Sequence, residues 1–268
     1  LAENSFNSEH LTSTLINSGV RIMTRTTAFG LYDNCVVGLL ERVNDHVFTH
    51  NDHSPRQRFW TIRAKHIILG TGSLERHIAF NNNDVPGMMT ANAAKHYLNR
   101  YGVLSGQEIV ISTNNDSVYA TANELTKAGS RVHIIDARNT ISQDIIEKAK
   151  SSGIEVSLGT TPFNINGRKK IDSLDVAEHD GQKYNKVNQI KCDLVLVSGG
   201  WSPVVHLLSH RGVRPIWDPV NLCFLPNETQ EPITVTGSAS GIWNTDDCVQ
   251  SGVSAGLKAA QSLGVKTI

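Results

Sequence analysis

The sequence has no excess of charge of either sign. Its 268 residues carry 25 Lys and Arg against 25 Asp and Glu, so the formal net charge is zero. A general nucleic-acid-binding protein is expected to show a basic excess or stripe, so no nucleic-acid partner is predicted. Hydrophobic residues make up 39% and charged residues 19%, and only 8 residues are proline. This composition is globular and excludes collagen, coiled coil and wholesale disorder.

Cysteines are few, and none of them forms a CxxC pair. The four are Cys35, Cys192, Cys223 and Cys248. A disulfide scaffold is not expected at this length, and a thioredoxin-like redox pair is absent. We interpret the four as reduced thiols, which predicts a cytoplasmic protein. No apolar run approaches the roughly 18 residues of a membrane-spanning helix, so no membrane partner is predicted.

Apolar runs that end in glycine alternate with amphipathic segments. Ile109–Ser112 and Arg131–Asp136 are predicted to be buried strands, and Ser117–Ala128 is predicted to be the helix between them. Strand, helix and strand in this order form a βαβ unit, so we expect an α/β fold with Rossmann-like parallel sheets. Further helices are predicted at 9–18, 90–101, 141–151 and 246–263. Further strands are predicted at 20–24, 36–43, 58–64, 67–69, 154–158, 194–198 and 233–236, with a polar hairpin region at 163–190.

Three predicted strands run directly into glycine. They end at Gly70-Thr71-Gly72, at Gly199-Gly200 and at Gly237. In an open α/β sheet, ligands bind outside the carboxyl ends of the strands, and glycine there lets a ligand approach the backbone. A turn alone also explains each one of these glycines. Three in one chain favour nucleotide sites.

The βαβ unit lacks the glycines of a dinucleotide fingerprint. When G-x-G-x-x-G is aligned on the helix end and on Asp136, its three glycines fall on Thr113, Asn115 and Val118. Asparagine tolerates positive φ better than most residues, and a helix N-terminus keeps N–H groups for a pyrophosphate. Two interpretations stay open: a degenerate dinucleotide site, or a structural Rossmann-like unit that binds no nucleotide.

An acidic residue does end the second strand of this unit. Asp136 lies where a carboxylate could bind the ribose hydroxyls, about 20 residues beyond the loop. A carboxylate there would repel a 2′-phosphate, so NAD is predicted over NADP. Arg138 lies two residues further on and is the residue type that accepts such a phosphate, which argues the other way.

Other clusters are weaker candidates. His46, His50 and His53 fall in a polar loop without cysteine, which favours a solvated loop, and no metal is predicted. Asp246 is interpreted as a first-turn charge that complements the dipole of the last helix. No residue resembles a catalytic base or nucleophile, so no catalytic residue is predicted.

Several stretches resemble the two-dinucleotide-fold flavoprotein oxidoreductases, the FAD/NAD(P)-binding superfamily. They are Gly70–Arg76, Asn82–Met89, Thr24–Asp33, Pro55–Arg58, Tyr97–Tyr101 and Thr113–Ser117. Within that superfamily, the chain is most similar to the alpha subunits of heterotetrameric sarcosine oxidases. The resemblance extends over nearly all of residues 9–264. It favours NAD binding, since members of that family also lack the glycines.

The resemblance implies an inserted arrangement. Residues 1–85 and 206–268 would be two pieces of an FAD-type domain, and residues 86–205 would be an NAD-type domain between them. The chain begins with Leu1 and is expected to be part of a larger subunit, with the first strand and glycine loop of the FAD-type domain before it. Ser238 stands where many such flavoproteins have an aspartate that binds the ribityl chain, which argues against tight FAD binding to this segment even in the intact subunit. FAD is expected to bind only in the intact subunit, because the glycine loop that holds its pyrophosphate is expected before Leu1. The predicted cofactor-binding residues are Thr113, Asn114, Asn115, Asp116, Ser117, Asp136, Arg138, Gly199 and Gly200, together with Gly70, Thr71, Gly72, Gly237, Ser238 and Asp246.

The implied function is nucleotide binding within a complex that oxidatively demethylates sarcosine, with other subunits of that complex as partners. The chain alone is expected to show no turnover. Two alternatives remain: a subunit of a related amino-acid or opine dehydrogenase, and a non-catalytic scaffold that docks partner subunits.

Overall fold

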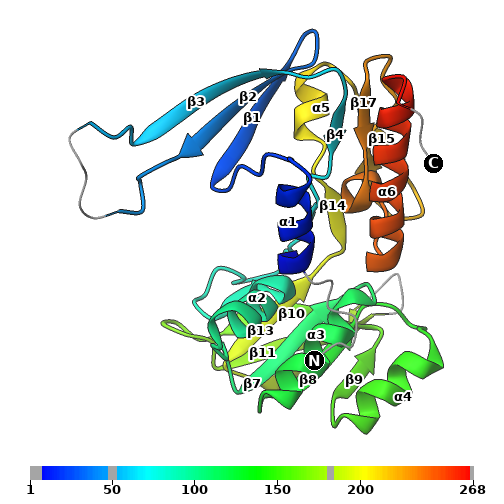
Figure 1. Ribbon diagram of the computed structural model, residues 1–268. Coiled ribbons are helices and arrows are strands. Elements are labelled where there is room, and N and C mark those ends of the chain that lie inside the picture. Colours follow the sequence, from blue (N-terminus) through cyan, green and yellow to red (C-terminus); the bar gives the residue numbers. More distant parts are fainter. Residues whose placement is uncertain (1–7, 48–52, 180–183, 266–268) are drawn as a thin grey trace. The chain divides into compact units, whose positions relative to one another are not determined.

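The structure is a computed structural model that describes residues 8–47, 53–179 and 184–265. It divides the chain into two compact units (Figure 1). Unit 1 comprises Leu1–Gly72 and Pro203–Ile268, and unit 2 comprises Ser73–Ser202. The sequence analysis placed these boundaries after residues 85 and 205. Residues 73–85 belong to unit 2, because Ile78, Phe80 and Val85 pack against a core cluster of that unit. That each unit binds a dinucleotide stays a prediction.

Unit 2 is built on a five-stranded sheet with the order β6-β13-β7-β8-β9. Every neighbouring pair in it is parallel. The predicted βαβ unit is confirmed, because the strand that begins at Glu108 pairs directly with the strand that ends at Asp136. The strands are β6 (Met88–Thr90), β7 (Glu108–Thr113), β8 (Arg131–Asp136), β9 (Glu155–Leu158) and β13 (Leu194–Ser198).

The central strands of this sheet are buried on both faces, which explains their continuous apolar sequences. In β8, Val132 and Ile134 belong to one core cluster and Ile135 belongs to another. The first cluster lies under α2 (Ala91–Tyr101), α3 (Ser117–Lys127) and α4 (Gln143–Ser151), the helices that Figure 1 shows beside the sheet. The second cluster lies under an antiparallel meander, β10 (Thr160–Asn166), β11 (Ser173–His179) and β12 (Tyr184–Lys191). The polar hairpin region is therefore three strands rather than two.

Local sequence signals set the ends of α2. The Thr90 side chain accepts a hydrogen bond from Ala93 N and caps the start of the helix. Gly102 ends it in the left-handed region, with φ of 65°, where glycine has no steric penalty.

Unit 1 contains a two-stranded parallel sheet of β4 (Ile67–Leu69) and β17 (Ile233–Val235), with α6 (Thr245–Ser262) packed against both strands. A three-stranded antiparallel sheet precedes it, made of β1 (Thr26–Tyr32), β2 (Val36–Arg42) and β3 (Gln57–Arg63). The remaining elements of unit 1 are α1 (Ser8–Asn17), α5 (His206–His210), β15 (Ile216–Asp218), β16 (Cys223–Leu225) and a 3-10 turn, Gly237–Ser240. β5 (Ser73–Glu75) belongs to unit 2 and pairs with β14 (Trp201–Pro203), which ends at the first residue of the second segment of unit 1.

Two sequence-based assignments need correction in unit 1. The predicted strand at residues 20–24 is wrong: this stretch has no regular structure and leads into a turn at Thr24 and Arg25, where Arg25 has φ of 51°. The strand begins at Thr26 instead, and β1 was not predicted. Its apolar residues are interrupted by Gly30 and by a register shift between Ala28 and Gly30, which breaks the alternation that a strand pattern needs.

Candidate functional site

The loop after β7 is closed by its own polar side chains. Thr113, at the end of the strand, is fully buried, and its hydroxyl accepts a hydrogen bond from Asn115 N at 3.1 Å. The Asn115 amide donates to Ser198 O at 3.0 Å, at the end of the neighbouring strand β13. Asn115 Oδ1 accepts from Ser117 N at 3.1 Å and so satisfies one N–H group that α3 leaves unpaired. Asparagine therefore holds this loop in place of the missing glycines.

The end of β13 lies beside this loop. Thr113 is in register with Ser198, and Gly199 and Gly200 follow directly. Gly200 has φ of 95°, a backbone conformation that L side chains rarely adopt, and a Cβ on it would lie 2.5 Å from Arg76 Nη2, so a larger residue would be strained and would displace that guanidinium. Trp201 Nε1 donates to Ser117 Oγ at 3.1 Å, which brings an indole to the start of α3.

Asp136 ends β8 at the same edge, opposite Thr113 in the register. Its side chain is 0% exposed. Oδ1 accepts from Arg138 N and Nε, each at 3.0 Å, and Oδ2 accepts from Arg138 Nη2 at 2.7 Å and from Tyr119 OH at 2.9 Å. Burial, with the adjacent Asp136 charge, raises the pKa of Tyr119 well above its ordinary value, so the hydroxyl stays a donor.

The predicted glycine residues of unit 1 also converge. β4 and β17 are parallel neighbours, so Gly70–Gly72 and Gly237 leave the sheet at one edge. A Cβ on Gly70 would lie 3.9 Å from Thr236 Cγ2, and a Cβ on Gly72 would lie 3.9 Å from Ser238 Oγ. Thr71 Oγ1 donates to Val204 O at 2.7 Å. The two glycine turns therefore form one cluster at the carboxyl ends of these strands.

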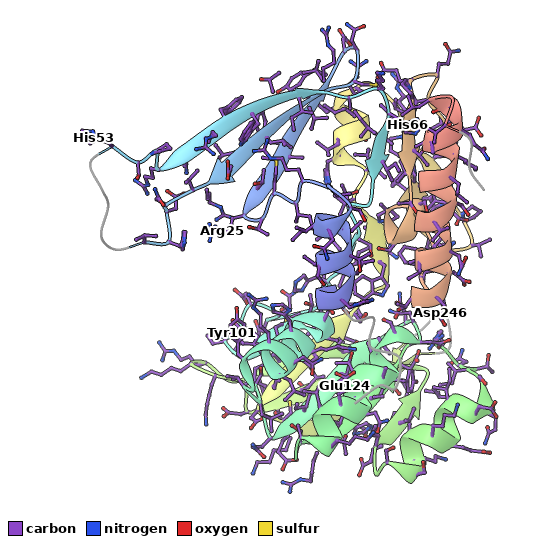
Figure 2. The ribbon with its side chains drawn as sticks, in the orientation of Figure 1. Arg25, His53, His66, Tyr101, Glu124 and Asp246 are labelled. Carbon is purple, nitrogen blue, oxygen red and sulfur yellow. The ribbon has the colours of Figure 1, made fainter. Side chains whose placement is uncertain are left out.

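Asp246 lies outside that cluster, in the exposed first turn of α6 (Figure 2). The cap of this helix is Asn244, whose Oδ1 accepts from Asp246 N at 2.9 Å and from Asp247 N at 3.3 Å. A carboxylate at this point complements the positive end of the helix dipole. Nothing further about Asp246 follows from its contacts.

The predicted site residues thus form two groups, one in each unit. The group in unit 2 comprises Thr113, Asn114, Asn115, Asp116, Ser117, Asp136, Arg138, Gly199 and Gly200, and the group in unit 1 comprises Gly70, Thr71, Gly72, Gly237 and Ser238. Sequence reasoning did not include Tyr119 and Ser198 among the site residues. Tyr119 had one usable signal: it is the third residue of a helix whose first turn follows the loop, so its hydroxyl could reach the end of the next strand.

Replacing Asn115 with Ala is expected to lower the stability of unit 2 by about 1–2 kcal/mol, because Ser117 N and Ser198 O each lose a partner. The neighbouring Asn114→Ala is the control, since Asn114 is exposed. Chemical denaturation of both variants measures the difference. Equal stability of the two variants would show that the loop does not depend on the Asn115 side chain.

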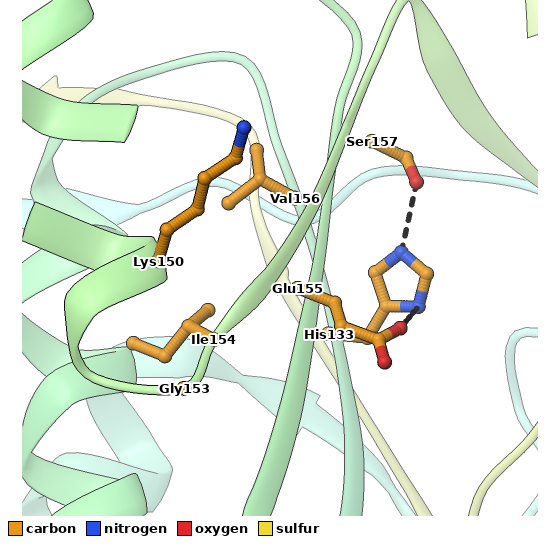
Figure 3. Close-up of a pocket in the computed structure, with 7 residues that line it drawn as sticks. All are labelled: His133, Lys150, Gly153, Ile154, Glu155, Val156 and Ser157. Carbon is orange, nitrogen blue, oxygen red and sulfur yellow. Dashed lines mark hydrogen bonds and ion pairs between the residues drawn. The ribbon is translucent and has the colours of Figure 1, made fainter. Parts of the chain in front are cut away.

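A pocket of about 500 Å³ opens away from this site, around the edge strand β9 (Figure 3). His133 Nε2 lies 2.9 Å from Ser157 Oγ, and His133 Nδ1 lies 3.4 Å from Glu155 Oε2. Burial lowers the pKa of His133, and the Glu155 charge offsets part of that effect. The Glu155 side chain is 79% exposed, so this carboxylate orients the imidazole only weakly.

The lowered pKa of His133 predicts acid sensitivity of unit 2. The folded state prefers neutral His133, so this stabilisation is complete above the ordinary histidine pKa of about 6.5 and is lost as the pH falls through the lower folded value. His133→Gln is expected to flatten the loss of stability between about pH 7 and about pH 5. The control is His77→Gln at an exposed position. An unchanged pH slope in His133→Gln, measured by urea unfolding, would contradict the prediction.

The remaining sequence predictions concern the histidine cluster, metal ligands, membrane-spanning helices and cysteines. His50 lies outside the described residues, and His46 Nε2 accepts a hydrogen bond from Arg25 Nη1 at 3.1 Å. Within residues 8–47, 53–179 and 184–265, no group of three potential metal ligands is present. In the same ranges, no helix has both the length and the apolar character needed to cross a bilayer. All four cysteines are free, and three of them are buried.

Comparison with known proteins identifies the family. Residues 12–217 match the family described as pyridine nucleotide-disulphide oxidoreductase. The chain belongs to this family. The expected FAD/NAD(P)-binding α/β fold is therefore confirmed, and the parallel sheets that end in glycine turns are the part of the fold that carries the candidate sites.

The resemblance to sarcosine oxidase alpha subunits is confirmed as well. The chain is 36% identical over 247 residues to the sarcosine oxidase subunit alpha of Rhizobium meliloti (strain 1021), which covers 92% of this chain and 24% of that subunit. It is 34% identical over 250 residues to the same subunit of Corynebacterium sp. (strain P-1), which covers 92% of this chain and 26% of that subunit. The chain thus spans about a quarter of the length of these relatives.

Several solved structures share the fold at low identity. L-proline dehydrogenase from P. horikoshii matches with a TM-score of 0.65 at 18% identity, over 100% of this chain and 48% of that chain. Bacillithiol disulfide reductase from Bacillus cereus matches with a TM-score of 0.65 at 16% identity, over 98% of this chain and 81% of that chain. These likenesses concern the fold and not the reaction.

Proposed function

We propose that this chain is the nucleotide-binding part of the alpha subunit of a sarcosine oxidase-like complex, located in the cytoplasm. The observation that carries the proposal is the continuous similarity to sarcosine oxidase alpha subunits, at 36% identity across 92% of the chain. Four free cysteines agree with a reducing compartment.

Unit 2 is proposed to bind NAD at the carboxyl ends of β7, β8 and β13. The positive φ of Gly200 supports this, as does the start of α3 beside it, since a helix N-terminus attracts a pyrophosphate. This site leaves fewer free N–H groups for a pyrophosphate than a glycine loop would, because Asn115 Oδ1 already accepts the hydrogen bond of Ser117 N. NAD bound there would supply hydride-transfer chemistry. The residues of unit 2 would position it.

Unit 1 is proposed to form part of an FAD-type domain in the intact subunit. The convergence of Gly70–Gly72 with Gly237 and Ser238 supports this, since a ligand can approach the backbone at such strand ends. Bound FAD supplies flavin redox chemistry. The side chains of unit 1 contribute hydrogen-bonding hydroxyls there, from Thr71 and Ser238, and no charged group from β4 or β17.

Two measurements test the proposal. Calorimetric titration of the chain with NAD⁺ is expected to show one site. The subunit that contains this chain, purified with its co-expressed partners, is expected to consume oxygen with sarcosine, and not with proline or an opine. Oxidation of proline or an opine instead would favour a related dehydrogenase. Absence of both NAD⁺ binding and turnover would favour a non-catalytic scaffold.

A further inference from the structure

Asp136, the residue predicted to bind the ribose hydroxyls, has no free acceptor for them. A carboxylate offers about four lone-pair sites for hydrogen bonds. All four of Asp136 are taken by this chain: three by Arg138 N, Nε and Nη2, and one by Tyr119 OH. Its side chain is also 0% exposed. Asp136 therefore holds Arg138 in place and leaves no acceptor for a ribose hydroxyl.

Arg138 is held by a second carboxylate as well. Its Nη1 lies 2.8 Å from Asp116 Oδ1. The guanidinium thus spans Asp136, at the end of β8, and Asp116, in the loop before α3. The hydrogen bonds that Arg138 donates to Asp136, and next those to Asp116, raise the pKa of Arg138 above its ordinary value, so its charge is permanent. A 2′-phosphate that approached Arg138 would have to displace Asp116 from Nη1.

The accessible charge of this cluster is negative. The cluster of Asp116, Asp136 and Arg138 contains one guanidinium and two carboxylates, so its formal charge is −1. Asp136 is buried, whereas the side chain of Asp116 is 60% exposed. Asp116 also makes no side-chain cap to α3, although it stands at the N-cap position. Its carboxylate is therefore turned to Arg138 and to solvent rather than to the helix.

Resting on the proposed NAD site, we propose that Asp116, and not Asp136, selects a nucleotide with a free 2′-hydroxyl over one with a 2′-phosphate. An exposed carboxylate accepts a hydrogen bond from a hydroxyl. The same carboxylate repels a phosphate and keeps Arg138 from pairing with it. Arg138 is a positioning residue in this arrangement, and Asp136 anchors it.

The test compares the binding of NAD⁺ and NADP⁺ by calorimetry in the whole chain and in three variants. Asp116→Asn is expected to raise the affinity for NADP⁺ relative to NAD⁺ on the order of tenfold, because it removes one repulsive charge and weakens the hold of residue 116 on Arg138 Nη1. Asp116→Glu keeps the charge and is expected to retain the preference for NAD⁺. Asp144→Asn, in the exposed first turn of α4, removes the same charge elsewhere in unit 2 and is the matched control.

The ratio of the two affinities is the deciding quantity, since a change in folding alone would weaken both nucleotides together. An unchanged ratio in Asp116→Asn, with NAD⁺ still bound, overturns this inference and leaves the proposed function standing. If the unsubstituted chain binds neither nucleotide, the NAD site and this inference fail together.

Discussion

Replacing Arg138 with Met is expected to destabilise unit 2 by about 3–5 kcal/mol, the range found when one partner of a buried ion pair is removed. Asp136 would remain fully buried with its charge, and Tyr119 OH would be its one remaining side-chain donor among the contacts of the described residues. The measurement is the free energy of unfolding from chemical denaturation.

The control for this prediction is Arg131→Met. Arg131 also pairs with a carboxylate, Glu108, but its side chain is 83% exposed, so the loss is expected to stay below about 1 kcal/mol. Removing the charge of the other partner, by Asp136→Asn, is expected to lower the free energy of unfolding less than Arg138→Met does. Arg138 is 31% exposed and still has Asp116, so water and that carboxylate can solvate its charge. Equal losses in Arg138→Met and Arg131→Met would contradict the account.

Replacing Leu196 with Ala is the second prediction with a large expected effect. Leu196 is 0% exposed in β13, the strand between β6 and β7, and it belongs to the core cluster under the helices. Deleting a buried leucine side chain removes its transfer free energy and leaves a cavity, so a loss of about 3–5 kcal/mol is expected.

Leu74→Ala is the matched control for Leu196→Ala. Leu74 is a leucine in a strand of the same unit, but it is 61% exposed, so its truncation is expected to change stability by less than about 0.5 kcal/mol. Denaturant unfolding gives the free energy of unfolding of both variants, which differ in the burial of the deleted leucine side chain. A small loss in Leu196→Ala would mean that the sheet collapses around the missing side chain.

The sheet of unit 2 was predictable because its strands are buried on both faces. Ile109–Ser112, Arg131–Asp136 and Leu194–Ser198 are apolar runs rich in β-branched residues, too short for helices and next to glycine or polar turns, which together favour buried strands. β1 was not predictable, since the register shift near Gly30 breaks its alternation and all but two of its residues are partly or fully exposed. The predicted strand at residues 20–24 failed because it depended on only three apolar residues, Val20, Ile22 and Met23, and so short a run also occurs by chance outside strands.

The candidate site was predictable as a place and not as a set of contacts. The end of β8 was correctly located, since parallel strands bring their carboxyl ends to one edge. The sequence shows Asp136 and Arg138 two residues apart, but it cannot show whether the arginine turns toward a ligand or back onto the aspartate. That choice depends on Tyr119 and Asp116, which come from a helix and a loop about 20 residues earlier.

The chain leaves unit 1 after Gly72 and re-enters it at Pro203, and Val204 N donates to Gly72 O at 2.9 Å across that point. The two crossing strands are thus fastened to each other at the base of the inserted segment, so residues 73–202 behave as a loop whose ends are already joined. The contacts within unit 1 offset the entropic cost of closing such a loop, and this cost grows only slowly with the length of the insert. The closure of unit 1 should therefore depend only weakly on the length of the segment between Gly72 and Pro203.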